Sequence, residues 1–300
     1  MIRDAVTDAG FAAGWSAIRR MPEGAAYALF RQVADRTYRR NGTGVQRLRA
    51  NLARVRPDAT PGELDELTLE GMRSYLRYWC DAFRLPSWSR ERVVDRFHVE
   101  DEQRMADALA TGRGVILVLP HMGNWDHAGA WACLDHAPLT TVAERLKPES
   151  LYDRFVAYRE SLGMEVLPLG GTDVVRTLAE RLKAGGLVCL LGDRDLTKGG
   201  VEVEFFGETT KMPAGPALLA DMTGAVLLPV TLWYDGPDSW GRIHPEVEIM
   251  RDGRDRPTRI ADATQQVARA FEEGIAAHPR DWHMLQRLWL SDLDPAKAPE

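Results

Sequence analysis

A histidine and an aspartate five residues apart, His121 and Asp126, form the pair in this chain that is best suited to proton transfer. They lie in the stretch LPHMGNWDHAGAW, directly after the apolar run GVILVLP at 114–120. A carboxylate bonded to one imidazole nitrogen fixes the tautomer, so that the other nitrogen accepts a proton near neutral pH. We therefore expect His121 to act as a general base and Asp126 to orient it.

The position of His121 in the chain supports this expectation. In open α/β sheets, ligands bind at the carboxyl ends of the strands, and the run 114–120 predicts a strand that ends just before His121. Asp193 follows a second apolar run, 185–192, so we expect it at the same edge. The alternatives are that His121 is a capping or core histidine, that Asp126 is a first-turn acid favoured by the helix dipole, and that Asp193 only pairs with Arg194 or caps a turn.

The elements that must position these residues predict an α/β fold with a mainly parallel central sheet, helices on both faces and a helical N-terminal region. Short apolar runs bounded by Gly and Pro predict strands at 114–120, 140–144, 164–169, 185–192, 225–234 and 244–250. Helical patterns cover 4–20, 22–40, 44–55, 61–83, 122–135, 149–161, 172–184, 214–223 and 261–277. No linker divides the chain, so we expect one domain over 1–300, with helices over 1–100 and the α/β core over 112–290.

The composition is that of a globular protein with a sizeable core, with 45% hydrophobic and 27% charged residues among 300. Its three cysteines are far apart and lack disulfide or zinc-ligand spacing, which favours a reducing compartment and no metal site. No run of 18 apolar residues predicts a spanning helix, and acids near the N-terminus argue against an export signal. The net charge of −6 disfavours nucleic acid as a partner.

Charge is nonetheless uneven along the chain. Residues 1–56 contain 11 arginines, no lysine and 4 acidic residues, a net charge of +7. Trp15 stands close to Arg19 and Arg20 in this segment, and basic helices that carry aromatic residues bind anionic membrane surfaces. The alternative is a pair of helices that packs on the domain with a solvated basic face.

Four stretches together resemble a known family: HMGNWD, AERLKPESLYDRFVAYRESLG, VEVEFFGETTKMPAGPALLA and DWHMLQRLW. The chain resembles the bacterial lipid A acyltransferase superfamily, which has an HX4D motif and a glycerolipid-acyltransferase-like fold. It resembles most the branch of phosphatidylinositol mannoside acyltransferases. The resemblance implies transfer of a palmitoyl-like chain from acyl-CoA to the mannose 6-hydroxyl of a phosphatidylinositol mannoside. It also implies a peripheral protein on the cytoplasmic face of the plasma membrane, without a metal or a bound cofactor.

The resemblance also implies roles for individual residues. An acid at position 193 partners the catalytic histidine in this family, usually as glutamate in the mannoside branch. This chain has Asp193, one methylene shorter, and its direct contact with His121 stays open. The substrate-binding residues implied in the same way are Gly123, Asn124, Glu144, Arg159 and His283. Lys198 and Gly199 are expected from the residues themselves, near a CoA phosphate beside the FFGETTKMPAG stretch. Read from the residues alone, Glu144 and Arg159 could equally be solvated surface side chains and His283 a packing residue.

Other functions remain as alternatives. One is a different lipid or glycolipid O-acyltransferase of the lipid A type. A second is a metal-dependent hydrolase, suggested by Asp126 followed by His127, but a binuclear zinc motif HxHxDH requires histidines where this chain has Met122 and Asn124. A third is a lipid-binding module without catalysis, for which His121 is dispensable.

Overall fold

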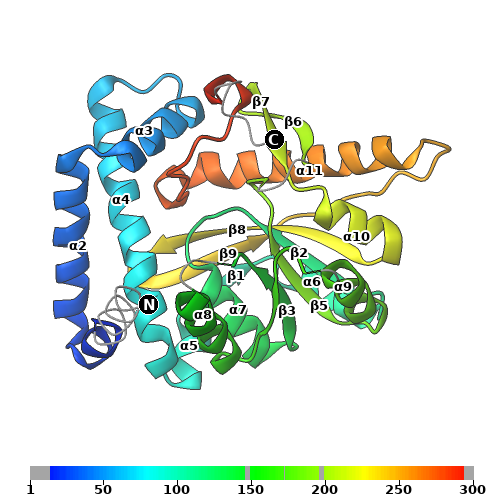
Figure 1. The fold of residues 1–300 in the computed structure, drawn as a ribbon, viewed down its shortest axis with the longest axis horizontal. Coiled ribbons are helices and arrows are strands. Elements are labelled where there is room, and N and C mark those ends of the chain that lie inside the picture. Colours follow the sequence, from blue (N-terminus) through cyan, green and yellow to red (C-terminus); the bar gives the residue numbers. More distant parts are fainter. Residues whose placement is uncertain (1–13, 146–148, 172, 196–198, 294–300) are drawn as a thin grey trace.

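A seven-stranded sheet forms the centre of the computed structural model, which describes residues 14–145, 149–171, 173–195 and 199–293 (Figure 1). Within these residues the strand order is β1-β9-β8-β2-β5-β3-β4. β8, β2, β5, β3 and β4 run parallel, β9 is antiparallel to β8, and β1 is parallel to β9. The expected mainly parallel sheet is confirmed. The strand bounds are β1 Phe97–Glu100, β2 Val115–Leu119, β3 Leu139–Ala143, β4 Glu165–Pro168, β5 Leu187–Leu191, β8 Val226–Asp235 and β9 Asp238–Ile243.

The central strand β2 is buried on both faces because its apolar residues alternate between two cores. Ile116 and Val118 belong to one hydrophobic cluster, whereas Val115, Leu117 and Leu119 belong to the other. Such continuous apolar strands require cover on both sides of the sheet. α9, α10 and α11 contribute to the first cluster, and α5, α6, α7 and α8 to the second. These helices span α5 Arg90–Asp95, α6 Gln103–Ala110, α7 Trp125–Asp135, α8 Glu149–Ser161, α9 Val174–Lys183, α10 Gly215–Thr223 and α11 Arg256–Ala277.

The N-terminal helices α2 (Glu23–Arg40), α3 (Thr43–Val55) and α4 (Pro61–Arg84) gather beside one end of the sheet, at the left of Figure 1. α4 begins with a capping box in which Thr60 accepts from the Glu63 backbone and the Glu63 side chain accepts from the Thr60 backbone. Its last turns reach the body of the protein, where Arg77 donates to the carbonyl of Gly236 in the β8–β9 turn. The predicted helical N-terminal region is therefore attached directly to the sheet.

Trp15 does not have the exposed position expected of a membrane anchor. Its indole Nε1 donates to the carbonyl of Phe83 at 2.9 Å, and its ring contacts Phe155 and Tyr158. Arg19 donates to the same carbonyl at 3.1 Å. At this point the helical segment packs on the domain, as the alternative proposed.

Two expectations for secondary structure are wrong. Residues 97–100 are a strand although residues 1–100 were expected to be helical, and residues 244–250 are not a strand. The segment 244–250 runs beside β8 with two backbone hydrogen bonds, from His244 to Pro229 and from Val247 to Leu227. Pro229 and Pro245 have no N–H, so a regular ladder cannot continue there.

A separate two-stranded hairpin, β6 (Val201–Phe205) and β7 (Glu208–Met212), carries the FFGETTKM stretch. Its two-residue turn consists of Phe206 at φ 49° and Gly207 at φ 76°. Positive φ at both positions is typical of the type I′ turn that matches the twist of antiparallel strands. Phe205 is completely buried and packs on Trp289, so it is a core residue.

None of the helices in the described part of the chain combines the length and the apolar composition needed to cross a bilayer.

Candidate active site

His121 and Asp193 meet at the carboxyl edge of the sheet. Leu119 of β2 is paired in register with Leu191 of β5, and each of the two polar residues lies two positions further along its own segment. The Nδ1 atom of His121 is 2.6 Å from Oδ1 of Asp193, and the backbone N–H of His121 donates to Oδ2 at 2.9 Å. The direct contact between Asp193 and His121, which the sequence left open because aspartate is shorter than glutamate, is therefore present.

The Asp193 carboxylate is fully buried, with 0% of its surface exposed. A third donor, Nε1 of Trp282, reaches its Oδ2 at 3.1 Å. Burial acts to raise the pKa of the Asp193 carboxyl, but the attraction of His121 and the donated hydrogen bonds outweigh it and hold the pKa below its usual value. Asp193 is therefore ionised at neutral pH and accepts hydrogen bonds only.

This arrangement selects one tautomer of His121. Because the carboxylate accepts, Nδ1 carries the proton and Nε2 presents a lone pair. Nε2 makes no hydrogen bond to another residue in the described part of the chain, while the ring packs edge-on against Trp125 at a centroid distance of 5.7 Å. His121 is thus prepared to accept a proton through Nε2.

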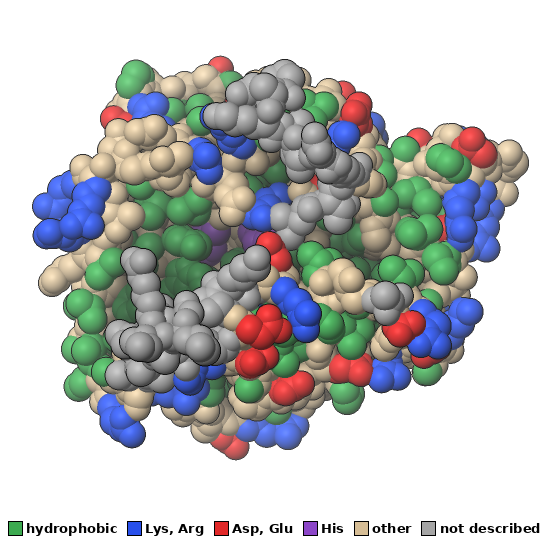
Figure 2. Space-filling model, in the orientation of Figure 1, with side chains coloured by type: hydrophobic (Ala, Val, Ile, Leu, Met, Phe, Trp, Pro, Cys, Tyr) green, Lys and Arg blue, Asp and Glu red, His purple; other side chains and the backbone are tan. Residues whose placement is uncertain are grey.

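His121 borders a cavity of about 340 Å³ whose walls are largely aromatic and apolar. Figure 2 shows histidine side chains at the floor of a hollow framed by hydrophobic ones. Its charged or polar lining residues are His121, Glu144, Arg159, Arg194, His283 and Gln286. Its aromatic and aliphatic lining residues are Tyr75, Tyr78, Trp79, Trp125, Val142, Ala143, Tyr152, Phe155, Leu191, Met284 and Leu285.

The loop that carries His121 is held by a C-terminal segment far away in the sequence. Met122 and Trp282 form an antiparallel bridge, and the N–H of His283 donates to the carbonyl of His121 at 2.7 Å. Gly123 donates to the carbonyl of Asp281 at 2.9 Å. At Gly123, with φ 56°, a Cβ would lie 2.8 Å from the backbone carbon of Leu232, so only glycine fits.

The expected contact between Asp126 and His121 is wrong. Asp126 is buried in the first turn of α7, and its carboxylate accepts from the hydroxyl of Tyr78 at 2.9 Å and from Nε of Arg159 at 2.7 Å. These partners come from α4 and α8. Asp126 therefore joins three helices instead of orienting the ring of His121.

Asn124 and His127 also have structural contacts. Asn124 is the N-cap of α7, and its Oδ1 accepts from the N–H of His127 at 2.9 Å. The ring of His127 is buried, with Nε2 2.8 Å from the carbonyl of Val93 and Nδ1 3.0 Å from the hydroxyl of Ser239. Burial lowers the pKa of His127 to about 4. Since both ring nitrogens are engaged, His127 does not offer a metal ligand to the cavity.

One group of metal-type ligands is found in the described ranges, namely Glu102, Asp135 and His136, with donor atoms within 4.8 Å of one another. Nε2 of His136 already lies 3.0 Å from the Glu102 carboxylate, which makes the pair a surface salt bridge when the ring is protonated. None of the three lines the cavity of His121.

His283 lies in the cavity wall, as the resemblance implied. Its Nε2 is 2.9 Å from the hydroxyl of Ser74, which is itself 2.6 Å from Asp281 Oδ1. Because the Ser74 hydroxyl donates to the carboxylate, its oxygen accepts from Nε2–H, and Nδ1 of His283 is left as a buried acceptor without a hydrogen bond among the described residues. Burial, reinforced by His121, lowers the pKa of His283 to about 3, so the ring is neutral.

The other residues named from the sequence divide into two groups. Glu144 and Arg159 border the cavity, Glu144 from just after β3 and Arg159 from α8. Gly123 and Asn124 are buried and Gly199 is exposed before β6, and none of these three is among the lining residues. Lys198 lies outside the described residues.

Sequence reasoning missed Trp282, Tyr78 and Arg194. Trp282 completes the set of donors on Asp193, Tyr78 bonds Asp126, and Arg194 lines the cavity directly after Asp193. The stretches RYWCDAF and DWHML concentrate aromatic and polar residues, which is a signal for a site, but no spacing rule connects them to His121 across the chain.

Comparisons with known proteins identify the family of the chain. The family model for bacterial lipid A biosynthesis acyltransferase matches residues 3–291. A protein named phosphatidylinositol mannoside acyltransferase from Mycolicibacterium smegmatis is 50% identical over 291 residues, covering 96% of this chain and 93% of the relative. Proteins of the same name from two strains of Mycobacterium tuberculosis are 47% identical over 300 residues, covering 97% of this chain and 91% of each relative. The chain thus belongs to the bacterial lipid A biosynthesis acyltransferase family.

Proposed function

We propose that this protein transfers a long, palmitoyl-like acyl group from acyl-CoA to the mannose 6-hydroxyl of a phosphatidylinositol mannoside. One observation carries the proposal: Nδ1 of His121 is held by the buried Asp193 carboxylate, and the ring borders an open aromatic cavity. The names of the similar mycobacterial proteins support this acceptor.

In the proposed reaction, Nε2 of His121 takes the proton of the sugar hydroxyl while the hydroxyl oxygen attacks the thioester carbon. The imidazolium that forms is stabilised by Asp193, as a buried carboxylate does in catalytic triads. The tetrahedral intermediate collapses to the ester, the carbon–sulfur bond breaks, and the proton on Nε2 passes to the departing thiolate of CoA. The balance is one hydroxyl and one thioester in, one ester and one thiol out, so acyl-CoA is a co-substrate and the scheme needs no metal or cofactor.

The cavity supplies groups for both substrates. Apolar and aromatic walls suit an acyl chain, and a few polar groups fix orientation. Nδ1 of His283 is a buried acceptor for a sugar hydroxyl, and Glu144 accepts from a hydroxyl at the more exposed rim. The basic Arg194, beside Asp193, is placed to meet a phosphate.

The acceptor is a membrane lipid, and we place the reaction at the anionic cytoplasmic face of the plasma membrane. The outer side of α2 carries exposed Leu29 and Val33 together with Arg36 and Arg40. Exposed apolar and basic side chains on one helix are typical of peripheral membrane contact.

The test is to incubate purified protein with radiolabelled palmitoyl-CoA and a panel of lipids that includes phosphatidylinositol mannosides, and to repeat it with His121→Ala. Loss of a general base lowers turnover by about 10²–10⁴-fold. His98→Ala is the matched control, because His98 is a partly exposed histidine of β1 outside the cavity lining. Near wild-type transfer by a folded His121→Ala protein would contradict the base, and transfer to another lipid in the panel would contradict the acceptor.

A further inference from the structure

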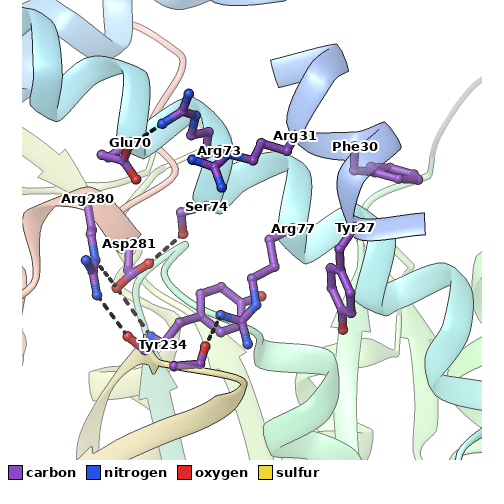
Figure 3. A pocket seen from close by; sticks show the side chains of 11 residues that line it. Tyr27, Phe30, Arg31, Glu70, Arg73, Ser74, Arg77, Tyr234, Arg280 and Asp281 are labelled. Carbon is purple, nitrogen blue, oxygen red and sulfur yellow. Dashed lines mark hydrogen bonds and ion pairs between the residues drawn. The ribbon is translucent and has the colours of Figure 1, made fainter. Parts of the chain in front are cut away.

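A second cavity, of about 400 Å³, lies between α2, α4, the β8–β9 turn and the short 3-10 helix Pro279–Asp281 (Figure 3). It lies on the other side of α4 from the active-site cavity. Arg73 and Arg77 of α4 line the second cavity, whereas Tyr75 and Trp79 of the same helix line the first. A ligand of this cavity is therefore distinct from a sugar bound at His121.

Four arginines line the second cavity, and only one of these four is hydrogen-bonded to carboxylates of the described residues. Arg73 is the exception, because Asp35 binds it at 2.6 and 3.0 Å and Glu70 at 2.6 Å. Arg31, Arg77 and Arg280 make no hydrogen bond to a carboxylate anywhere in the described residues. Arg31 is exposed on α2 and has neither a hydrogen bond nor an ion pair in that part of the chain.

The hydrogen bonds of Arg77 and Arg280 go to backbone carbonyls. Arg77 donates to the carbonyls of Gly236 and Pro237 at 2.8 and 2.7 Å, with its guanidinium 3.8 Å above the ring of Tyr234. Its Nε is buried and has no hydrogen bond. Arg280 donates to the carbonyl of Tyr234 at 3.2 Å. Neutral carbonyls orient these guanidiniums without cancelling their charge.

The nearest carboxylates compensate this charge weakly. Asp81 is 3.7 Å from Nε of Arg77, and Asp281 is 3.6 Å from Nε of Arg280, both beyond hydrogen-bonding distance. Burial raises the pKa of both carboxyls. The lining itself contains four arginines and two acidic residues, Glu70 and Asp281, so basic side chains are in excess around the cavity.

We propose that this second cavity binds the phosphate group of a phosphate ester. Guanidinium groups match phosphate through paired N–H donors, and Arg31, Arg77 and Arg280 approach one cavity from three different elements. The aromatic rings of Tyr27 and Phe30 form another wall, which leaves space for the organic part of the ester. This site does not depend on the acyl acceptor proposed above.

The variants for the test must leave unchanged the residues whose contacts hold the active site. Ser74 and Asp281 line the second cavity but hold His283, whose N–H binds the His121 loop. We therefore choose Arg31→Gln with Arg280→Gln, since both arginines are largely exposed. Arg36→Gln is the matched control, because Arg36 is an exposed arginine of α2 that does not line the cavity.

Calorimetric titration of the full-length protein with inorganic pyrophosphate at low salt tests the site. We expect saturable binding by the wild type and by Arg36→Gln, and binding at least about tenfold weaker by the double variant, because two charge-assisted contacts are lost. Should the double variant unfold, Arg31→Gln alone takes its place, since this side chain makes no hydrogen bond or ion pair with another described residue. Absence of saturable binding by the wild type, or equal affinity in wild type and variant, would overturn the proposal.

Two further arms distinguish the source of the phosphate. Glycerol phosphate is titrated as a soluble ester, and vesicles of phosphatidylinositol in phosphatidylcholine are used in co-sedimentation. If the double variant binds these vesicles less than the wild type does, the site takes a lipid headgroup. If vesicle binding is unchanged while glycerol phosphate binding is lost, the ligand is a soluble phosphate ester. If the double variant binds both the vesicles and glycerol phosphate as the wild type does, the proposal is overturned.

Discussion

The three hydrogen bonds donated to Asp193 explain how a buried carboxylate keeps its charge beside His121. An isolated buried carboxylate would take up a proton, but donors and a nearby imidazole favour the ionised form. The charge in turn determines which nitrogen of His121 carries the proton. Trp282, which is outside the cavity lining, thus adds one donor to the interactions by which His121 keeps Asp193 ionised.

Replacing Asp193 with Asn tests this dependence. An amide can donate to Nδ1, which selects the opposite tautomer and places a proton on Nε2. We expect kcat to fall by about 10³-fold or more, as for comparable changes in catalytic triads, with little change in KM for acyl-CoA. Steady-state kinetics on the folded variant measure this, and kinetics equal to those of the wild type would remove Asp193 from the mechanism.

His127 predicts a pH dependence of stability that is separate from catalysis. The pKa of His127 is about 4 in the folded protein, below its value in the unfolded chain. At a pH below the unfolded pKa, the unfolded chain therefore binds more protons than the folded protein does. Stability is therefore complete above pH ~6.5 and falls as the pH decreases toward 4, by roughly 2 kcal/mol at pH 5.

The comparison with His127→Gln isolates this contribution, because glutamine does not titrate and can still donate to the Val93 carbonyl. Urea denaturation at pH 7 and pH 5 measures the free energy of unfolding. We expect the wild type to lose about 2 kcal/mol more than the variant between these values. Equal losses would mean that the ring is not held neutral in the folded protein.

Among the elements, the apolar runs predicted the parallel strands well, because a strand buried on both faces has no polar positions. The runs at 114–120 and 185–192 contain β2 and β5 completely. The strand expected at 244–250 is wrong because HPEVEIM has a strand-like alternation, whereas Pro245 within it and Pro229 on the neighbouring strand both lack the N–H that a regular ladder needs. Pro245 can be read from the segment itself, but the position of Pro229 beside it cannot.

The site was predicted only in part, because local sequence does not show which strands are neighbours in the sheet. The histidine, and its position after a strand, follow from local sequence, whereas its partner depends on β2 and β5 being neighbours in the sheet. Asp193 is 72 residues from His121, and Asp126 only five. Proximity in the sequence favoured Asp126, whose carboxylate is instead used between α4, α7 and α8.

The contacts of Asp126 predict that Asp126→Asn acts mainly on folding. The change leaves Arg159 largely buried without its carboxylate, and breaking a buried ion pair costs about 3–5 kcal/mol. We expect a decrease of that size in the free energy of unfolding, measured by urea denaturation. Adding Arg159→Gln removes the unpaired charge and should recover part of the loss. An inactive Asp126→Asn protein with wild-type stability would return Asp126 to a direct role beside His121.

At the scale of the whole molecule, the basic residues of the N-terminal region have three different surroundings. Arg19 packs on the domain beside Trp15, Arg31 lines the second cavity, and Arg36 and Arg40 face outward near Leu29 and Val33. Net charge alone could not separate them. The proposed contact with an anionic membrane belongs to the outward group.

We predict that Arg36→Gln with Arg40→Gln weakens binding to anionic vesicles. Each basic residue near such a surface contributes about 1 kcal/mol, so two contribute roughly 2 kcal/mol, or about thirtyfold in partitioning. Co-sedimentation with anionic and neutral vesicles at low and high salt measures this, since salt screens the attraction. Arg176→Gln with Arg269→Gln, on α9 and α11 away from α2, is the control (Figure 1). Equal binding by both double variants would exclude docking through α2.

The bridge between Met122 and Trp282 has a consequence for the order of events during protein synthesis. Asp193 is translated 72 residues after His121, and Trp282 a further 89 residues after Asp193. A nascent chain therefore contains the histidine long before the indole and the backbone groups that fix its loop. In the proposed mechanism, the ability to activate a hydroxyl is acquired only after residues 281–283 have been made. A protein cut after residue 280 would retain all seven strands of the central sheet but lose the backbone and indole groups that hold His121 and Asp193.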